Sequence, residues 1–171
     1  MRYRLLSLFL VLPAVAGAQG GAGVSAVHET WKDVTAFVAR AAEQMPEADY
    51  AYRPAATVRT FGQLVGHVAG SQKLMCAAAL GEPAGNEDDV EKSATTKQAL
   101  VAAMRATTAY CERAYAQSDA AVTAKTTLFG QQVTRMYALS LNATHNGEHY
   151  GNIVTYLRLK GIVPPSSEPR K

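Results

Sequence analysis

The sequence predicts an all-α protein, a four-helix bundle in which four amphipathic segments pack around one core. Three observations support this fold class. Apolar residues recur at intervals of three and four along four segments, which places them on one face of a helix. Stretches that contain proline or glycine separate these segments and end the helical pattern. Alternating apolar and polar runs, which are typical of strands, are scarce, so a bundle is favoured over a sheet.

The first 18 residues have the pattern of a signal peptide. A basic start over residues 1–4 precedes a mainly apolar stretch over residues 5–15, and Ala16-Gly-Ala18 follows as a small-residue cleavage site. The apolar stretch is too short for a bilayer, which needs roughly 20 residues. We therefore expect residues 1–18 to be removed and residues 19–171 to form one periplasmic or secreted domain without a stable membrane anchor. An uncleaved anchor or a buried helix is the alternative.

The first helix of the bundle is expected over residues 26–44. Its apolar positions follow helical spacing, and they are Val27, Trp31, Val34, Val38 and Ala41 or Ala42. Trp31 on this stripe is interpreted as a core residue. Pro46 ends the helix, and residues 45–59 form a proline-containing connection.

A second helix is expected over residues 60–80. The hydroxyl of Thr57 or Thr60 can cap it by accepting a hydrogen bond from a free backbone N–H group. Its inward positions are Phe61, Leu64, Val68, Met75 and Ala79. Residues 81–90 are acidic and rich in turn formers, and we expect them to cross to the next helix.

The third helix is expected over residues 93–117 and the fourth over residues 133–160. Between them, residues 118–132 are expected to be irregular, with a short extended piece at 126–129. The inward positions of the third helix are Leu100, Met104, Tyr110 or Cys111, and Ala114. The fourth helix has a strong stop, because Lys160 lies in its last turn and Gly161 and Pro164-Pro165 follow.

The charge balance gives no reason to expect a nucleic-acid partner. The chain has 17 Lys and Arg residues against 14 Asp and Glu residues, a net charge of +3. Removal of Arg2 and Arg4 with the leader lowers the 17 to 15, which leaves about +1. No basic patch stands out, so we expect no binding to nucleic acid or to anionic lipid.

The two cysteines, Cys76 and Cys111, leave two alternatives open. Their spacing matches no metal-binding motif. In an exported protein they could form a disulfide bond, whereas two free buried thiols are equally compatible with the sequence.

Three histidines on the predicted helices are candidate metal ligands. His145 and His149 are four residues apart, so both lie on one helix face, about a turn from each other. They border a stripe that holds Ala138, Leu141, Asn152 and Tyr156. His67 lies beside the apolar arc of its own helix, and three imidazoles would leave coordination positions open, as in catalytic sites. The plain alternative is three hydrogen-bonded core histidines, since periodicity does not show that the two helices are adjacent. The fourth histidine, His28, is interpreted as a surface or capping residue.

Two segments resemble the DinB-like (damage-inducible) helical-bundle superfamily. The first is Met45-Pro-Glu-Ala-Asp-Tyr-Ala-Tyr-Arg-Pro54, followed by Thr60-Phe-Gly-Gln-Leu-Val-Gly-His67. The second is His145-Asn-Gly-Glu-His149-Tyr-Gly-Asn-Ile-Val-Thr-Tyr-Leu-Arg158, followed by Lys160-Gly-Ile-Val-Pro-Pro165. The resemblance covers nearly all of residues 19–171, and the motifs occur in the family's order.

The resemblance implies a bundle in up-down-down-up order, with a long crossing between the second and third helices. It implies that three histidines hold one divalent metal ion, with nickel or zinc expected first. His67 matches the family's helix-two ligand, and His145 and His149 match its helix-four pair. The order makes the second and third helices parallel, which brings Cys76 and Cys111 closer than a simple hairpin would. Family members are often dimeric, so a homodimer is an expected assembly.

The expected function is that of an exported divalent-metal-binding bundle, as a metal-dependent hydrolase or a thiol transferase acting on a small molecule. An ion with an open position would acidify bound water or polarise a substrate oxygen. No catalytic residue is identified, since Glu148 beside the ligands is interpreted as solvated. Export disfavours the thiol-dependent activity of some relatives, because their co-substrate should be scarce outside the cytoplasm. The alternative is a non-catalytic metal-binding or stress-related module.

Overall fold

Four long helices form the bundle in this computed structural model, which describes residues 22–169. They are α1 (Ala22–Gln44), α2 (Phe61–Leu80), α4 (Lys97–Tyr115) and α5 (Arg135–Leu159). The smaller elements are α3 (Asp89–Ser93), the strands β1 (Lys125–Leu128) and β2 (Gln131–Thr134), and 3-10 turns at Glu47–Asp49, Ala121–Thr123 and Pro165–Ser167. The predicted signal peptide at 1–18 lies outside the described residues. Among residues 22–169, no helix is long and apolar enough to cross a membrane.

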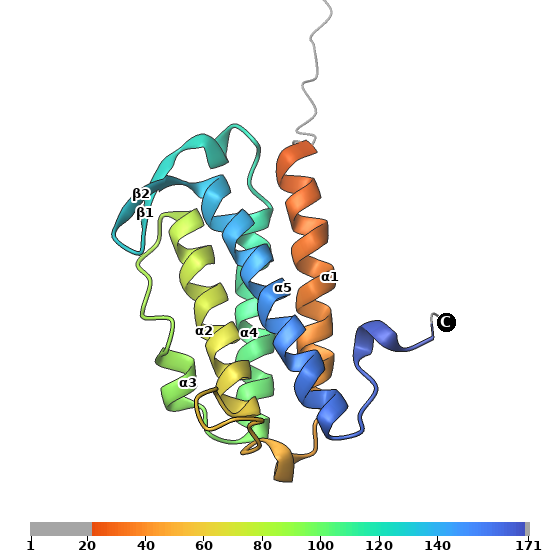
Figure 1. Ribbon diagram of the computed structural model, residues 1–171. Coiled ribbons are helices and arrows are strands. Elements are labelled where there is room, and N and C mark those ends of the chain that lie inside the picture. The colour runs from red at the N-terminus through yellow and green to blue at the C-terminus, as the bar shows by residue number, and fades with distance from the viewer. Residues whose placement is uncertain (1–21, 170–171) are drawn as a thin grey trace, which may run out of the picture.

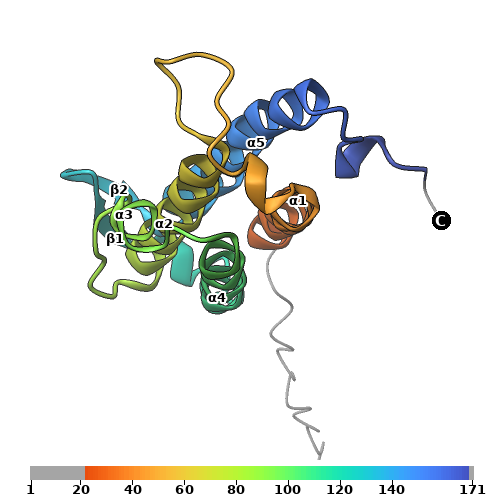
Figure 2. The same ribbon diagram turned by 90° about the horizontal axis from the view of Figure 1, so that it is seen from below.

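The four helices follow the up-down-down-up order. In Figure 1, α1 and α5 run in one direction, whereas α2 and α4 run in the opposite direction and are parallel to each other. The chain must therefore return along the bundle between α2 and α4. Residues 81–96, which include α3, make this return along the outer side of α2 (Figure 1, Figure 2). The predicted fold class and the long crossing are confirmed.

Helix α2 is the most enclosed of the four long helices. Sixteen of its 20 residues are buried, against six of 23 in α1 and nine of 25 in α5. Figure 2 shows the reason, since α3 and the hairpin cover one side of α2 while α4 and α5 cover others. Thr60 caps the helix in a capping box with Gln63, which selects Thr60 over Thr57, and Gly81 ends it with a φ of 73°.

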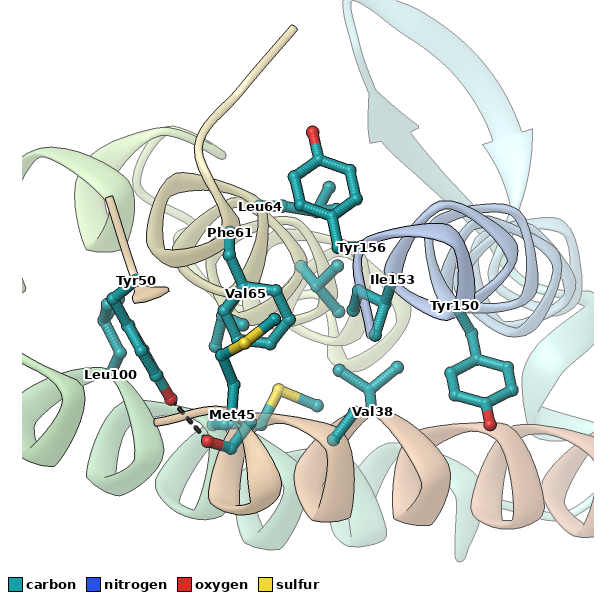
Figure 3. Packing of buried hydrophobic residues seen from close by; sticks show 14 of the residues in the cluster. Val38, Met45, Tyr50, Phe61, Leu64, Val65, Leu100, Tyr150, Ile153 and Tyr156 are labelled. Atoms are coloured by element: carbon teal, nitrogen blue, oxygen red, sulfur yellow. Dashed lines mark hydrogen bonds between the residues drawn. The ribbon is translucent and has the colours of Figure 1, made fainter. Parts of the chain in front are cut away.

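One half of the bundle, near the connection between α1 and α2, contains a core of large apolar side chains. Figure 3 shows Val38 of α1, Phe61 of α2 and Ile153 of α5 meeting there, and none of the three is exposed. The hydroxyl of Tyr50 donates a hydrogen bond to the carbonyl of Ala42, which ties the connection to α1. The start of α2, where His67 lies two turns further on, is thereby held in place.

The other half of the core contains a disulfide bond. Cys76 of α2 and Cys111 of α4 are joined, with their Cα atoms 5.3 Å apart, and both side chains are fully buried. They belong to an apolar cluster with Trp31 of α1 and Leu139 of α5. The sequence left open whether Cys76 and Cys111 form a disulfide or stay as free thiols, and the structure contains the disulfide. The parallel order of α2 and α4 brings the two cysteines together.

The prediction of one third helix over residues 93–117 is wrong. The chain forms two helices there, α3 ending at Ser93 and α4 beginning at Lys97. The hydroxyl of Thr96 accepts a hydrogen bond from the N–H of Ala99, so α4 has its own N-cap and begins as a separate helix. The chain needs this break because the return segment must change direction before α4 can run along α2.

The region predicted to be irregular, residues 118–132, contains a hairpin strand. β1 pairs antiparallel with β2, with Lys125 opposite Thr134. The turn uses Phe129 and Gly130, both with positive φ, at 50° and 75°. The extended piece expected at 126–129 was thus nearly correct, and its partner strand was missed. Consequently α5 begins at Arg135, capped by Thr134, and not at residue 133.

Candidate metal centre

The three candidate ligands lie on two adjacent helices. His67 is near the middle of the enclosed helix α2 and is only 5% exposed. His145 and His149 lie one turn apart on α5 and are half-buried. Because α2 and α5 pack side by side, the three imidazoles face one another across the helix pair.

The three rings are close enough to share one ion. The ring centroid of His67 lies 5.2 Å from that of His145 and 4.9 Å from that of His149. The ring centroids of His145 and His149 lie 4.3 Å apart. One candidate nitrogen from each ring lies within 4.8 Å of the others. The Nε2 atoms of His145 and His149 are 3.0 Å apart. Two nitrogens bound to one ion at about 2.1 Å lie about 3.0–3.4 Å apart, so this spacing suits ligation.

The imidazoles are held in the form that a metal ion requires. The pKa of each histidine is lowered from 6.5 to about 4, mainly because burial penalises the charged ring. The charge of Arg59 lowers all three pKa values further. At neutral pH the rings therefore carry lone pairs and no charge. The Nδ1 atoms of His67 and His145 are buried without a hydrogen-bond partner among the described residues, so the hydrogen bonds expected for satisfied core histidines are incomplete.

A pocket opens beside His149. It has a volume of about 410 Å³, and its walls come from the loop before α2 and from the last turns of α5. The lining residues are Pro54, Thr57, Val58, Arg59, Leu64, His149, Asn152, Thr155 and Tyr156. The hydroxyl of Tyr156 donates a 2.6 Å hydrogen bond to the carbonyl of Arg59, which fixes the loop against α5. The amide nitrogen of Asn152 lies 3.4 Å from Nδ1 of His149.

Acidic side chains that the sequence reasoning missed lie on the other side of His67. Oδ1 of Asp88 is 3.9 Å from Nδ1 of His67, and Glu91 lies in the same group. The Nε atom of Arg59 pairs with Glu91 at 3.0 Å. From the sequence, residues 81–90 were predicted only to be an acidic connection between two helices. A signal was available in Gly66 and Gly70, which flank His67 and allow a close approach of another backbone.

The remaining candidates lie as the sequence predicted. His28 is half-buried at the surface, where it stacks on the rings of Trp31 and Tyr115 and its Nε2 lies 2.9 Å from Oε2 of Glu112, and it takes no part in the histidine cluster. Glu148 is exposed, as expected for a solvated residue. Of the stripe beside the histidines, Ala138 and Tyr156 are buried, whereas Asn152 is exposed at the pocket.

Comparison with protein families gives one match over most of the chain. A family model described as the DinB superfamily matches residues 26–153. No curated protein matches the chain.

Solved structures with the same fold are distant in sequence. A DinB-like protein from Bacillus cereus has a TM-score of 0.71 and 15% identity, with 82% of this chain and 95% of that chain covered. YfiT from Bacillus subtilis, described as a probable metal-dependent hydrolase with an unusual four-helix bundle topology, has a TM-score of 0.62 and 15% identity over 90% and 94%. A mycothiol-dependent maleylpyruvate isomerase has a TM-score of 0.60 and 18% identity over 77% and 59%. At these identities the likeness shows the fold alone.

Proposed function

Because the chain belongs to the DinB superfamily, we propose that it is an exported metal-dependent hydrolase that holds one divalent ion on His67, His145 and His149. Nickel and zinc are the ions of choice, because imidazole nitrogens suit both. The observation that carries the proposal is the meeting of three neutral imidazoles from two helices, each offering a nitrogen within 4.8 Å of the others.

The ion supplies Lewis acidity when bound, so that it can polarise a substrate oxygen or acidify water. Three protein ligands leave room for a substrate or water beside them. Helix α2 fixes His67 through burial on all sides, and the one-turn spacing on α5 fixes the other two ligands relative to each other. Arg59 adds a positive charge that keeps the imidazoles neutral.

The pocket supports a catalytic role over a purely structural one. A structural ion is enclosed by its ligands, whereas His149 forms part of the wall of the 410 Å³ pocket. That volume suits a small molecule. The pocket wall combines apolar surface from Val58 and Leu64 with hydrogen-bonding groups such as Asn152, as small-molecule sites do.

The disulfide favours hydrolysis over a reaction that uses a low-molecular-weight thiol. A buried disulfide between Cys76 and Cys111 suits an oxidising compartment, where reduced cytosolic thiols are scarce. Water is available in every compartment. The signal peptide expected at residues 1–18 agrees with this choice.

Elemental analysis of the untagged mature protein tests the metal site. We expect about one divalent ion per chain in the wild type and a large loss of metal in His149→Ala. His28→Ala is the matched control, because His28 lies outside the cluster. Equal metal content in the wild type and in His149→Ala would refute the assignment.

Turnover of p-nitrophenyl acetate, and of amide and phosphate-ester analogues, tests the hydrolase. We expect hydrolysis that falls at least about tenfold on chelation and returns when zinc or nickel is added. Metal-loaded protein without turnover of any of the three classes would contradict the hydrolase and favour the non-catalytic metal-binding module.

A further inference from the structure

The return segment between α2 and α4 lies directly on the backbone of α2 next to His67. Two glycines make this approach feasible. A Cβ atom at Gly66 would lie 2.8 Å from Cα of Glu91, and one at Gly70 would lie 1.9 Å from the carbonyl oxygen of Glu87. Both distances are shorter than van der Waals contact, so only glycine fits. The two glycines lie one turn apart and flank His67, which places residues 87–91 against this part of α2.

Asp88 is the residue of this segment whose carboxylate lies near His67. It precedes α3, yet its side chain makes no capping hydrogen bond to that helix. Its Oδ1 lies 3.9 Å from Nδ1 of His67, which is buried and has no hydrogen-bond partner among residues 22–169. Lys92 and Arg59 lie 3.4 and 3.9 Å from the carboxylate oxygens. Both cations are thus within ion-pair distance of this carboxylate.

We propose that Asp88 is a positioning residue that accepts a hydrogen bond from Nδ1–H of His67 and so directs the lone pair of Nε2 toward His145 and His149. The inference rests on the proposed metal site for its purpose, although the contact itself does not require the ion. A hydrogen bond needs the two atoms to approach to about 2.7–3.2 Å, which is about 1 Å closer than their present separation of 3.9 Å. Asp88 is partly exposed and can make this small adjustment. Carboxylates that orient a ligating histidine in this way fix its tautomer and raise its basicity.

The geometry argues against a metal ion between His67, Asp88 and Glu91, although these three could in principle ligate one. Glu91 is already paired with Arg59 at 3.0 Å, and Lys92 and Arg59 lie beside Asp88. An ion at that place would have to displace or repel two cations. The cluster of His67, His145 and His149 experiences the charge of Arg59 as well, but its three donors are neutral imidazoles that form no ion pair with that guanidinium among residues 22–169.

The tautomer of His67 in metal-free protein at pH 7.5 tests the proposal directly. Nitrogen-15 NMR distinguishes Nδ1–H from Nε2–H, and the signals are assigned by comparison with His67→Gln. We expect His67 to carry its proton on Nδ1 in the wild type and to shift to a mixture or to Nε2–H in Asp88→Ala. Asp88→Asn, whose amide oxygen still accepts a hydrogen bond, should largely restore the wild-type tautomer. Asp89→Ala is the control, because its carboxylate binds the N–H of Asn86 and not His67.

Metal affinity provides the second measurement. Zinc titration of the same variants should show binding about 10–100-fold weaker in Asp88→Ala, an intermediate affinity in Asp88→Asn, which keeps the acceptor but loses the charge, and no change in Asp89→Ala. Circular dichroism confirms that each variant is folded. A His67 tautomer that is the same in the wild type and in Asp88→Ala, or an Nε2–H tautomer in the wild type, would overturn the proposal. If the tautomer shifts as expected while the wild type binds no zinc, the metal site fails and the role of Asp88 stands.

Discussion

His67 lies near two other segments, the return segment that carries Asp88 and the part of α5 that carries His145 and His149. It is the one ligand candidate on the most enclosed helix, and it lies close to polar groups of two other segments. Asp88 lies near Nδ1, and the pair on α5 lies across the ring. Burial of a neutral imidazole is inexpensive, whereas burial of a charged one is not, and pH therefore acts on the fold through this cluster.

The metal-free protein should lose stability as the pH falls from about 6.5 to about 4. In the folded state the three histidine pKa values are lowered to about 4, while in the unfolded chain they return to about 6.5. In this window the unfolded chain binds protons that the folded chain does not, so unfolding becomes easier as the pH decreases. Each histidine contributes up to about 1.4 kcal/mol per pH unit.

Urea denaturation at several pH values after chelation measures this dependence. The variant in which His67, His145 and His149 are all replaced by Gln provides the background from the carboxylates. A slope of the free energy of unfolding that is the same in both proteins would show that the histidines are not held neutral.

Gly70→Ala should destabilise the protein by about 1–3 kcal/mol, the usual cost of forcing extra atoms into a packed place. Its Cβ would lie 1.9 Å from a backbone oxygen that cannot rotate away. Gly151→Ala on α5 is the control, because nothing lies within 4 Å of its Cβ and alanine favours a helix by about 0.5–1 kcal/mol. Thermal unfolding should thus give shifts of opposite sign, and a stabilised Gly70→Ala would contradict the close approach.

At the scale of elements, the disulfide joins the two parallel helices. It links α2 to α4 across 35 residues that contain the whole return segment. The amide of Asn142 on α5 lies 3.3 Å from Sγ of Cys76, so a third helix contacts the same buried place. The disulfide therefore restrains α2, which carries His67, against α4.

Replacement of Cys76 and Cys111 by alanine should lower the free energy of unfolding by about 3–4 kcal/mol. This value follows from the closure entropy of a loop of about 35 residues. Urea denaturation of the double variant, compared with the wild type before and after reduction, measures it. If the double variant and the reduced wild type unfold at the same urea concentration as the oxidised wild type, the disulfide contributes nothing to stability.

The sequence predicted the long elements well and the short ones poorly, for physical reasons. Helical spacing identified α1, α2 and α5 to within a few residues because apolar residues recur at intervals of three and four along each of them. The break before α4 was missed because Ala94, Thr95 and Thr96 are ordinary helix residues until the hydroxyl of Thr96 is seen as a cap. The hairpin turn was missed because Phe129 occupies a positive-φ position at which Asn or Asp is the usual signal.

Local sequence patterns predicted only part of the candidate metal site. The spacing of His145 and His149 placed them together, but only the family resemblance joined them to His67, because adjacency of α2 and α5 is a property of the tertiary structure. Asp88 was not singled out, since an acidic residue in a crossing usually faces water. Gly66 and Gly70 around His67 were the local clue that another segment lies there.

At the scale of the whole molecule, the expected leader decides where the protein works. Export of the full chain should yield a product that begins at Gln19, because Ala16-Gly-Ala18 is the predicted cleavage site. Ala18→Arg should prevent processing, since signal peptidase requires a small residue there. Intact-mass measurement of the periplasmic fraction checks both. Unprocessed wild-type protein in the cytoplasmic fraction would show that residues 1–18 are not a signal peptide.

The return segment between α2 and α4 can be varied by protein engineering. Because α2 and α4 run parallel, residues 82–93 pass the histidine cluster on the outside of the bundle, and of their side chains only Val90 packs against an apolar cluster of the core. A combinatorial library confined to the positions other than Val90 would vary the charge and shape beside His67, one of the proposed ligands, while the scaffold stays constant. Selection from such a library could change which ion is preferred without redesigning the interior.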